Sequence, residues 1–153
     1  MKYEIQLFFS LTFVVSISTG QNLQIHYDFA EDRRYFTSTL EMYKPDEKGA
    51  TFWFVDFEYN QPGNKSASVG YWEFARYMNL SFMEGLSGTI QFNDGVSRWG
   101  PLGHVWLTGI TYPVDLKTTT VSTELLYRAA YGSKSHDGQL TFVFYVPLLN
   151  GKA

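Results

Sequence analysis

Cysteine is absent from this chain of 153 residues, which excludes disulfides, thiolate catalysis and cysteine-based zinc sites together. No basic stripe is present and the formal net charge is -3, so nucleic acid is not expected as a partner. Long apolar runs are missing beyond residue 20, because charges or turn residues interrupt each one, and a later transmembrane helix is excluded. Aromatic side chains are abundant instead, and tyrosine and tryptophan suit boundaries between dry and wet surroundings, including membrane interfaces.

The first twenty residues have the pattern of a secretory signal peptide. Lys2 supplies a positive start, Leu7 to Ile17 is mostly apolar, and Ser18 and Gly20 are small residues placed for cleavage before Gln21. The apolar run is shorter than the ~20 residues that a membrane-spanning helix needs. We therefore predict a signal peptide at residues 1–20 and one β-barrel domain at residues 21–153.

Residues 51–60 define the clearest strand. Its alternate positions form one apolar or aromatic face and one face that ends in two carboxylates, and a helix would mix the two sets. The first face holds Trp53, Val55, Phe57 and Tyr59, and the second holds Phe52, Phe54, Asp56 and Glu58.

The same alternation recurs along the chain and predicts about eight strands, many of about ten residues. The other segments are 22–29, 36–43, 68–78, 86–93, 118–131 and 139–148, with 104–114 strand-like but ambiguous in its faces. Turn residues at 44–49 and at Asp94-Gly95 are expected to interrupt the strands. Arg76 falls on the apolar face of its strand, so either its side chain reaches water at the strand end or a bulge shifts the alternation.

Strands of this length can cross a bilayer when tilted, whereas strands of soluble proteins usually have about five or six residues. Together with the signal peptide, they predict an all-β fold, an antiparallel transmembrane β-barrel with an apolar outside and a polar inside. A secreted lipocalin-like barrel or β-sandwich remains the alternative, because the same alternation fits an apolar core.

Four segments also carry a family resemblance: 22–29, 51–59, 71–76 and 149–152. They resemble an uncharacterised family of bacterial envelope proteins that is similar to the Tsx-type nucleoside-specific outer-membrane channels. The resemblance implies a twelve-stranded antiparallel barrel in the outer membrane of a Gram-negative bacterium, with passive diffusion of nucleosides or similar solutes. Family members continue beyond the Asn-Gly-Lys stretch, so we expect either a C-terminally incomplete barrel with two unpaired edges or a barrel closed at eight strands.

The predicted inward face supplies the candidate lumen and solute-binding residues. They are His26, Asp28, Glu41, Tyr43, Phe52, Asp56, Glu58, Glu73, Glu124 and Arg128. In a channel the aromatic rings offer stacking faces for a base, and the carboxylates accept hydrogen bonds from ribose hydroxyls. The simpler alternative is that the charged residues solvate a wet interior and pair with one another.

Enzymatic chemistry is not expected. No Gly-x-Ser-x-Gly elbow is present, and carboxylates two residues apart, as at Asp56 and Glu58, are ordinary in a polar lumen. His26 and Asp28 lack the paired-histidine spacing of a metal site, so neither a metal nor another cofactor is predicted.

The function expected from the sequence is that of an outer-membrane β-barrel acting as a passive channel, with membrane lipid and a small polar solute such as a nucleoside as partners. The alternatives are a secreted or periplasmic lipocalin-like barrel that binds a hydrophobic ligand, and a structural envelope protein that is not a channel. A membrane-barrel enzyme acting on lipids is disfavoured because no catalytic motif is present.

Overall fold

The computed structural model describes residues 10–16, 20–30, 33–60, 66–117, 119–132 and 136–144. These residues form ten strands and contain no helix long and apolar enough to span a bilayer. The strands are β1 (Ser10–Ser16), β2 (Gln21–Asp28), β3 (Phe36–Asp46), β4 (Gly49–Tyr59), β5 (Ala67–Asn79), β6 (Ser87–Ser97), β7 (Gly100–Pro101), β8 (Val105–Asp115), β9 (Thr120–Ala130) and β10 (Asp137–Phe144).

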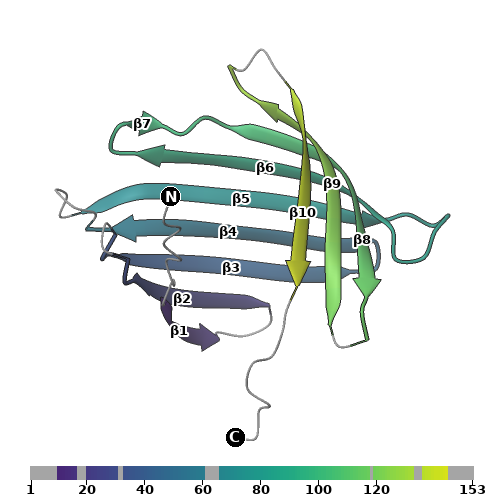
Figure 1. Ribbon diagram of the computed structural model, residues 1–153, viewed down its shortest axis with the longest axis horizontal. Coiled ribbons are helices and arrows are strands. Elements are labelled where there is room, and N and C mark those ends of the chain that lie inside the picture. The colour runs from purple at the N-terminus through teal and green to yellow at the C-terminus, as the bar shows by residue number, and fades with distance from the viewer. Residues whose placement is uncertain are drawn as a thin grey trace, which may run out of the picture.

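The strands form one antiparallel sheet in which neighbours in sequence are neighbours in space (Figure 1). Its order is β1-β2-β3-β4-β5-β6-β8-β9-β10, and the two-residue β7 pairs with β6 at the side. The predicted all-β antiparallel class is therefore confirmed. The path holds nine strands rather than about eight because β1, within the segment expected to be a signal peptide, pairs with β2 from Ser10↔Asp28 to Ser16↔Asn22.

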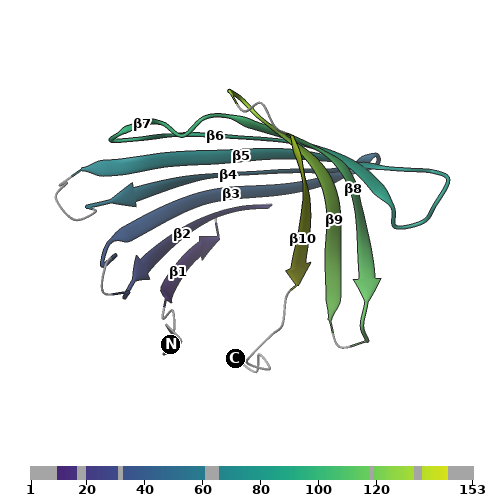
Figure 2. The ribbon, with the colours of Figure 1, turned by 45° about the horizontal axis from the view of Figure 1, so that its top comes forward.

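The sheet is strongly curved but open. Strands β8, β9 and β10 bend away from the plane of β2 to β6, so that the sheet forms a trough (Figure 2). Among the described residues β1 pairs only with β2 and β10 only with β9, so of the two expected forms the structure shows the open sheet with two unpaired edges and not a barrel closed at eight strands. A path of nine alternating strands gives β1 and β10 the same direction, and an antiparallel pair between them is therefore impossible.

The two faces of the trough differ in polarity. We call the inner side of the trough the concave face. Tyr77 on β5 and Glu124 on β9 lie on this side, because the hydroxyl of Tyr77 donates a hydrogen bond of 3.0 Å to Glu124 across the hollow above β6 and β8. The buried side chains of this face are Ala50, Ala75, Thr89, Leu107, Thr111, Glu124 and Leu126. The opposite, convex face exposes large apolar side chains on successive strands, among them Leu40, Phe57, Phe74, Ile90, Trp106, Ile110, Leu125 and Phe142.

The turn between β3 and β4 lies inside the predicted break at 44–49 but is shorter than predicted. Strand β3 continues through Pro45 to Asp46, and only Glu47 and Lys48 separate it from β4. Pro45 is tolerated because β2 ends its pairing with β3 at Met42, so the missing proline N–H falls on an unpaired stretch.

Strand β6 likewise continues through Asp94 and Gly95 to Ser97. A Cβ atom at residue 95 would lie 2.7 Å from Leu102 Cδ1 and 2.9 Å from the carbonyl oxygen of Gly70. Close packing of the strand, rather than a turn, therefore explains the glycine.

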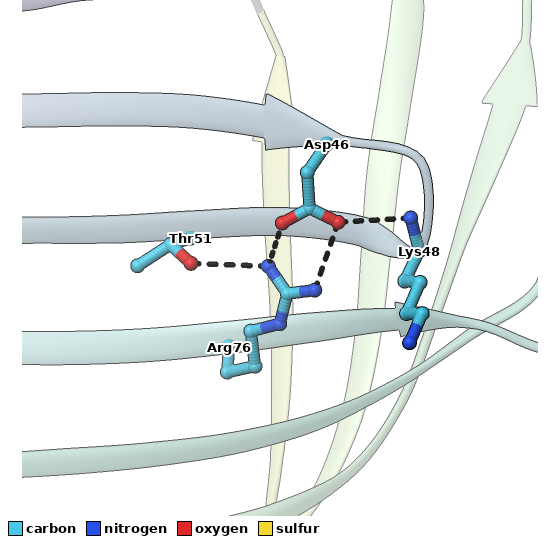
Figure 3. Close-up of polar contacts among 4 residues, drawn as sticks. All are labelled: Asp46, Lys48, Thr51 and Arg76. Carbon is cyan, nitrogen blue, oxygen red and sulfur yellow. Dashed lines mark hydrogen bonds and ion pairs between the residues drawn. The ribbon is translucent and has the colours of Figure 1, made fainter.

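Arg76 lies on the convex face at the turn end of β5, without a bulge in its pairing with β4 or β6 (Figure 3). Its guanidinium binds both carboxylate oxygens of Asp46, with Nη2 3.0 Å from Oδ1, and donates to Thr51 Oγ1 at 3.0 Å. The Asp46 carboxylate also accepts the main-chain N–H of Lys48. The first of the two alternatives for Arg76, a side chain at a strand end, is thus confirmed.

The ambiguous stretch at 104–114 is strand β8, and the structure assigns its faces. Trp106 and Ile110 lie on the convex face, whereas Leu107 and Thr111 lie on the concave face. The ambiguity arose because Leu107 is an apolar side chain on the polar face, where it is only 2% exposed.

Candidate functional site

Polar side chains on the concave face form separate hydrogen-bond networks, each centred on a carboxylate. The strand register positions them, since cross-strand neighbours on one face of a sheet lie within side-chain reach. The networks are centred on Glu124, Glu73, Asp56 and Glu41.

Glu124 on β9 is the most buried of these carboxylates, with 7% of its surface exposed. Its Oε1 accepts a hydrogen bond of 3.0 Å from the Tyr77 hydroxyl, and its Oε2 accepts one of 3.2 Å from Gln91 Nε2. The two donors come from β5 and β6, so the network joins the two arms of the trough. Nearby on the same face, the hydroxyl of Thr111 on β8 lies 3.2 Å from that of Ser122 on β9.

A cavity of about 500 Å³ lies beside Glu124, at the end of the trough near the β3–β4 turn. That volume falls within the roughly 300–1,000 Å³ of small-molecule sites. Side chains from β3, β4 and β5 form one wall and side chains from β8, β9 and β10 the other. Its lining residues are Tyr43, Gly49, Ala50, Phe52, Tyr77, Asn79, Gly85, Ser87, Thr111, Pro113, Ser122, Glu124 and Val143.

The second network surrounds Glu73 on β5. The hydroxyl of Tyr71 donates to Glu73 Oε1, and Asn93 Nδ2 donates to the same oxygen at 3.2 Å. The other amide atom of Asn93, Oδ1, is buried without a hydrogen-bond partner. The ring centroid of Tyr71 also lies 6.0 Å from that of Phe54, so this network borders the aromatic side chains of Phe54 and Phe52.

The remaining networks lie on β2, β3 and β4. Asn22 Nδ2 donates to Glu41 Oε1 at 3.0 Å, and Gln24 links Asn22 to the ring of His26. Further along the face, Thr39 Oγ1 donates to Asp56. This end of the concave face is lined almost wholly by hydrogen-bonding side chains, which suits a water-filled space.

Comparison with models of known protein families found a match. Residues 20–153 match the family model described as Domain of unknown function (DUF5020). The chain belongs to this family. No curated protein and no solved structure matches it. The family description names no activity, so the resemblance to Tsx-type channels stays a prediction for this DUF5020 protein.

Most of the predicted site residues share the concave face of the DUF5020 sheet. Tyr43 and Phe52 are directly opposite each other on β3 and β4, and both line the cavity with Glu124. The other candidates on this face, His26, Glu41, Asp56, Glu58, Glu73 and Arg128, lie outside the cavity lining.

Two predicted residues lie at strand ends and pair locally. Asp28 ends β2, where its carboxylate accepts the N–H of Ala30 and lies 3.4 Å from Arg33 Nη1. Arg128 lies 3.4 Å from Asp137 on β10. Among the described residues, no three histidine, aspartate or glutamate side chains are grouped as a metal site requires.

Sequence reasoning missed the donors that hold the carboxylates. Tyr77, Gln91 and Asn93 were left out of the candidates although each has the strand position that points inward. The alternation already placed Tyr77 on the face of Glu73 and Gln91 on the face of Asn93, so the signal was available. Which carboxylate each one reaches depends on the curvature of the sheet.

Proposed function

We propose that this DUF5020 chain forms the wall of an outer-membrane β-barrel and provides a passive path for nucleosides or similar small polar solutes. The observation that carries the proposal is the reversed polarity of the sheet. The concave face carries the hydrogen-bond networks of Glu41, Asp56, Glu73 and the buried Glu124, and the convex face exposes aromatic and aliphatic side chains. A protein wall between lipid and water requires this arrangement.

The convex face supports contact with lipid. In a row across three strands, Trp53, Phe74 and Phe92 lie side by side, and the ring of Trp106 packs against that of Phe92 in a tilted arrangement with centroids 4.7 Å apart. An exposed apolar surface that runs over many strands is unusual for a monomeric soluble protein and marks a binding surface or a membrane contact.

Strand lengths support a bilayer crossing. Strands β3, β4, β6, β8 and β9 have 11 residues each, and β5 has 13. A tilted strand crosses the hydrocarbon layer with about 9–11 residues. The family match also begins at residue 20, where the predicted signal peptide ends.

The proposal requires partners for the two open edges of the sheet. In hydrocarbon every main-chain N–H and C=O needs a partner, so both edges of the trough must be paired in the assembled protein. Cleavage of the predicted signal peptide would remove β1 and transfer the N-terminal edge to β2. The proposal therefore requires strand pairing along β2 and β10 beyond that of the described sheet.

A lipocalin-like protein would place its apolar side chains inside the curve, around a hydrophobic ligand. The concave face instead holds the networks of Glu41, Asp56, Glu73 and Glu124. No observation favours this alternative over the membrane proposal.

The proposal is tested by refolding the full chain into phospholipid vesicles. We expect a gel band that shifts on boiling, because a membrane barrel resists detergent until heated, and vesicle swelling in isotonic uridine or adenosine but not in dextran. A protein that stays soluble without detergent and shows no heat shift would overturn the membrane assignment. A heat shift without swelling would retain the barrel and remove the channel.

A further inference from the structure

Glu124 is a buried carboxylate without a described cationic partner. Its hydrogen-bond donors, Tyr77 and Gln91, are both neutral. The ion pairs among the described residues join Arg33 to Asp28, Arg76 to Asp46 and Arg128 to Asp137. A buried charge is costly unless an opposite charge and hydrogen bonds compensate it, and here only the hydrogen bonds are present.

The carboxylate retains capacity to bind more donors. Each Glu124 oxygen accepts one hydrogen bond, whereas an ionised carboxylate has about four acceptor positions. Glu124 is also part of the wall of the 500 Å³ cavity, so a molecule inside that cavity lies within reach of it.

The other walls of the cavity suit a cation. Tyr43, Phe52 and Tyr77 contribute three aromatic rings, whose faces attract positive charge. Thr111 and Ser122 add hydroxyl groups. None of the described lining residues is a lysine, arginine or histidine, so no positive group competes for Glu124 inside the cavity.

We infer that the cavity between β3–β5 and β8–β10 is a binding site for small organic cations that carry an ammonium group. Glu124 supplies the counter-charge and the rings of Tyr43, Phe52 and Tyr77 enclose the cation. The inference rests on the proposed function in that the cavity would lie on the path of the solute. It adds small organic cations to the neutral solutes, such as nucleosides, that the proposed path would accept.

The test compares choline with its neutral isostere 3,3-dimethylbutan-1-ol, using the full chain in detergent micelles and calorimetric titration at constant ionic strength. The two probes have nearly the same shape, so a difference in affinity measures the response to charge. We expect choline to bind more tightly by roughly tenfold or more. Equal affinity, or binding of neither probe up to about 100 mM, overturns the inference.

Glu124→Gln keeps an amide oxygen for Tyr77 and removes the charge, and it should abolish the preference for choline. Glu47→Gln is the matched control, because Glu47 is exposed on the β3–β4 turn and outside the cavity lining. It should retain the full preference. Retention of the preference in Glu124→Gln, or its loss in Glu47→Gln, would show that the bound cation is not held at Glu124.

The swelling assay separates this inference from the proposed function. Swelling in nucleosides without a preference for choline removes the cation site and keeps the channel. A choline preference that depends on Glu124, without swelling in any solute, keeps the site and removes the channel.

Discussion

The two faces of the sheet are built from the same strands, yet they are held in opposite ways. On the convex face, cross-strand aromatic pairs dominate, as between Tyr27 and Phe36, whose ring centroids are 4.9 Å apart. On the concave face, hydrogen bonds dominate, and those from Tyr77 and Gln91 to Glu124 connect strands that are not neighbours. The difference shows that large exposed apolar side chains gather on the convex face, whereas the buried carboxylate Glu124 and its hydrogen-bond donors lie on the concave face.

This reversal changes what a substitution should cost. In a protein with an apolar core, a charge on the exposed face is cheap and a charge on the buried face is expensive. If lipid surrounds the convex face, the order is inverted. The following substitutions compare the loss of stability on the two faces, from the largest expected loss to the smallest.

The largest effect is expected for Phe74→Lys on the convex face. Phe74 lies opposite Trp53 and Phe92, away from the strand ends, and is 46% exposed. A lysine facing lipid near the middle of a bilayer costs about 2–4 kcal/mol of folding free energy. Denaturant titration in vesicles, followed by tryptophan fluorescence, measures the loss.

Thr37→Lys is the control for Phe74→Lys on the concave face. Thr37 lies opposite Glu58 and His26 on neighbouring strands, so an added ammonium group faces polar surroundings. We expect it to change stability by less than about 1 kcal/mol. Equal losses for the two lysines would remove the distinction between a lipid-facing and a water-facing side.

An intermediate effect is expected for Tyr77→Phe on the concave face. It deletes the hydroxyl that donates to Glu124 and leaves that buried carboxylate with Gln91 alone. A hydrogen bond to a charged group contributes about 1.5–3 kcal/mol, and the same unfolding titration should show a loss of this size.

Tyr112→Phe provides the comparison for Tyr77→Phe, because Tyr112 is exposed on β8 and should lose little. In the double variant Tyr77→Phe with Glu124→Gln, the two losses should not add, since both changes act on one bond. Additive losses would mean that the bond between β5 and β9 does not hold the arms of the trough together.

The smallest effect is expected for Gly109→Ala, which tests the close approach of β8 and β9. A Cβ atom at residue 109 would overlap the carbonyl oxygen of Leu125 and lie 2.9 Å from the Cα of Leu126. Such overpacking costs about 1–3 kcal/mol, to be measured as a lower denaturant midpoint.

Gly88→Ala is matched to Gly109→Ala in chemistry and in secondary structure. The atoms nearest to a Cβ at residue 88 are Leu80 Cδ2 at 3.8 Å and the Gly109 carbonyl oxygen at 4.0 Å, which are ordinary contacts. We expect a change of about half a kcal/mol or less. A midpoint for Gly109→Ala that is no lower than for Gly88→Ala would contradict the close packing.

Most of the strands, and the face on which most of their residues lie, follow from local sequence alone. Side chains alternate along any extended backbone, so the division of residues 51–59 into an apolar and a polar set is a local property. For the same reason, the antiparallel all-β class and the inward position of Glu73 and Glu124 could be predicted. Asp94-Gly95 misled the prediction, because a glycine that permits close packing has the same local signature as a glycine in a turn.

Which distant strands are joined by hydrogen bonds, and why Glu124 becomes buried, depends on the tertiary structure. Tyr77 and Glu124 are 47 residues apart, and their bond exists because the sheet curves β9 back over β5. The burial of Leu107 and Leu126 on the polar face, and the cavity beside Glu124, follow from the same curvature. Register and curvature arise from pairing among all the strands, so no single stretch of sequence contains them.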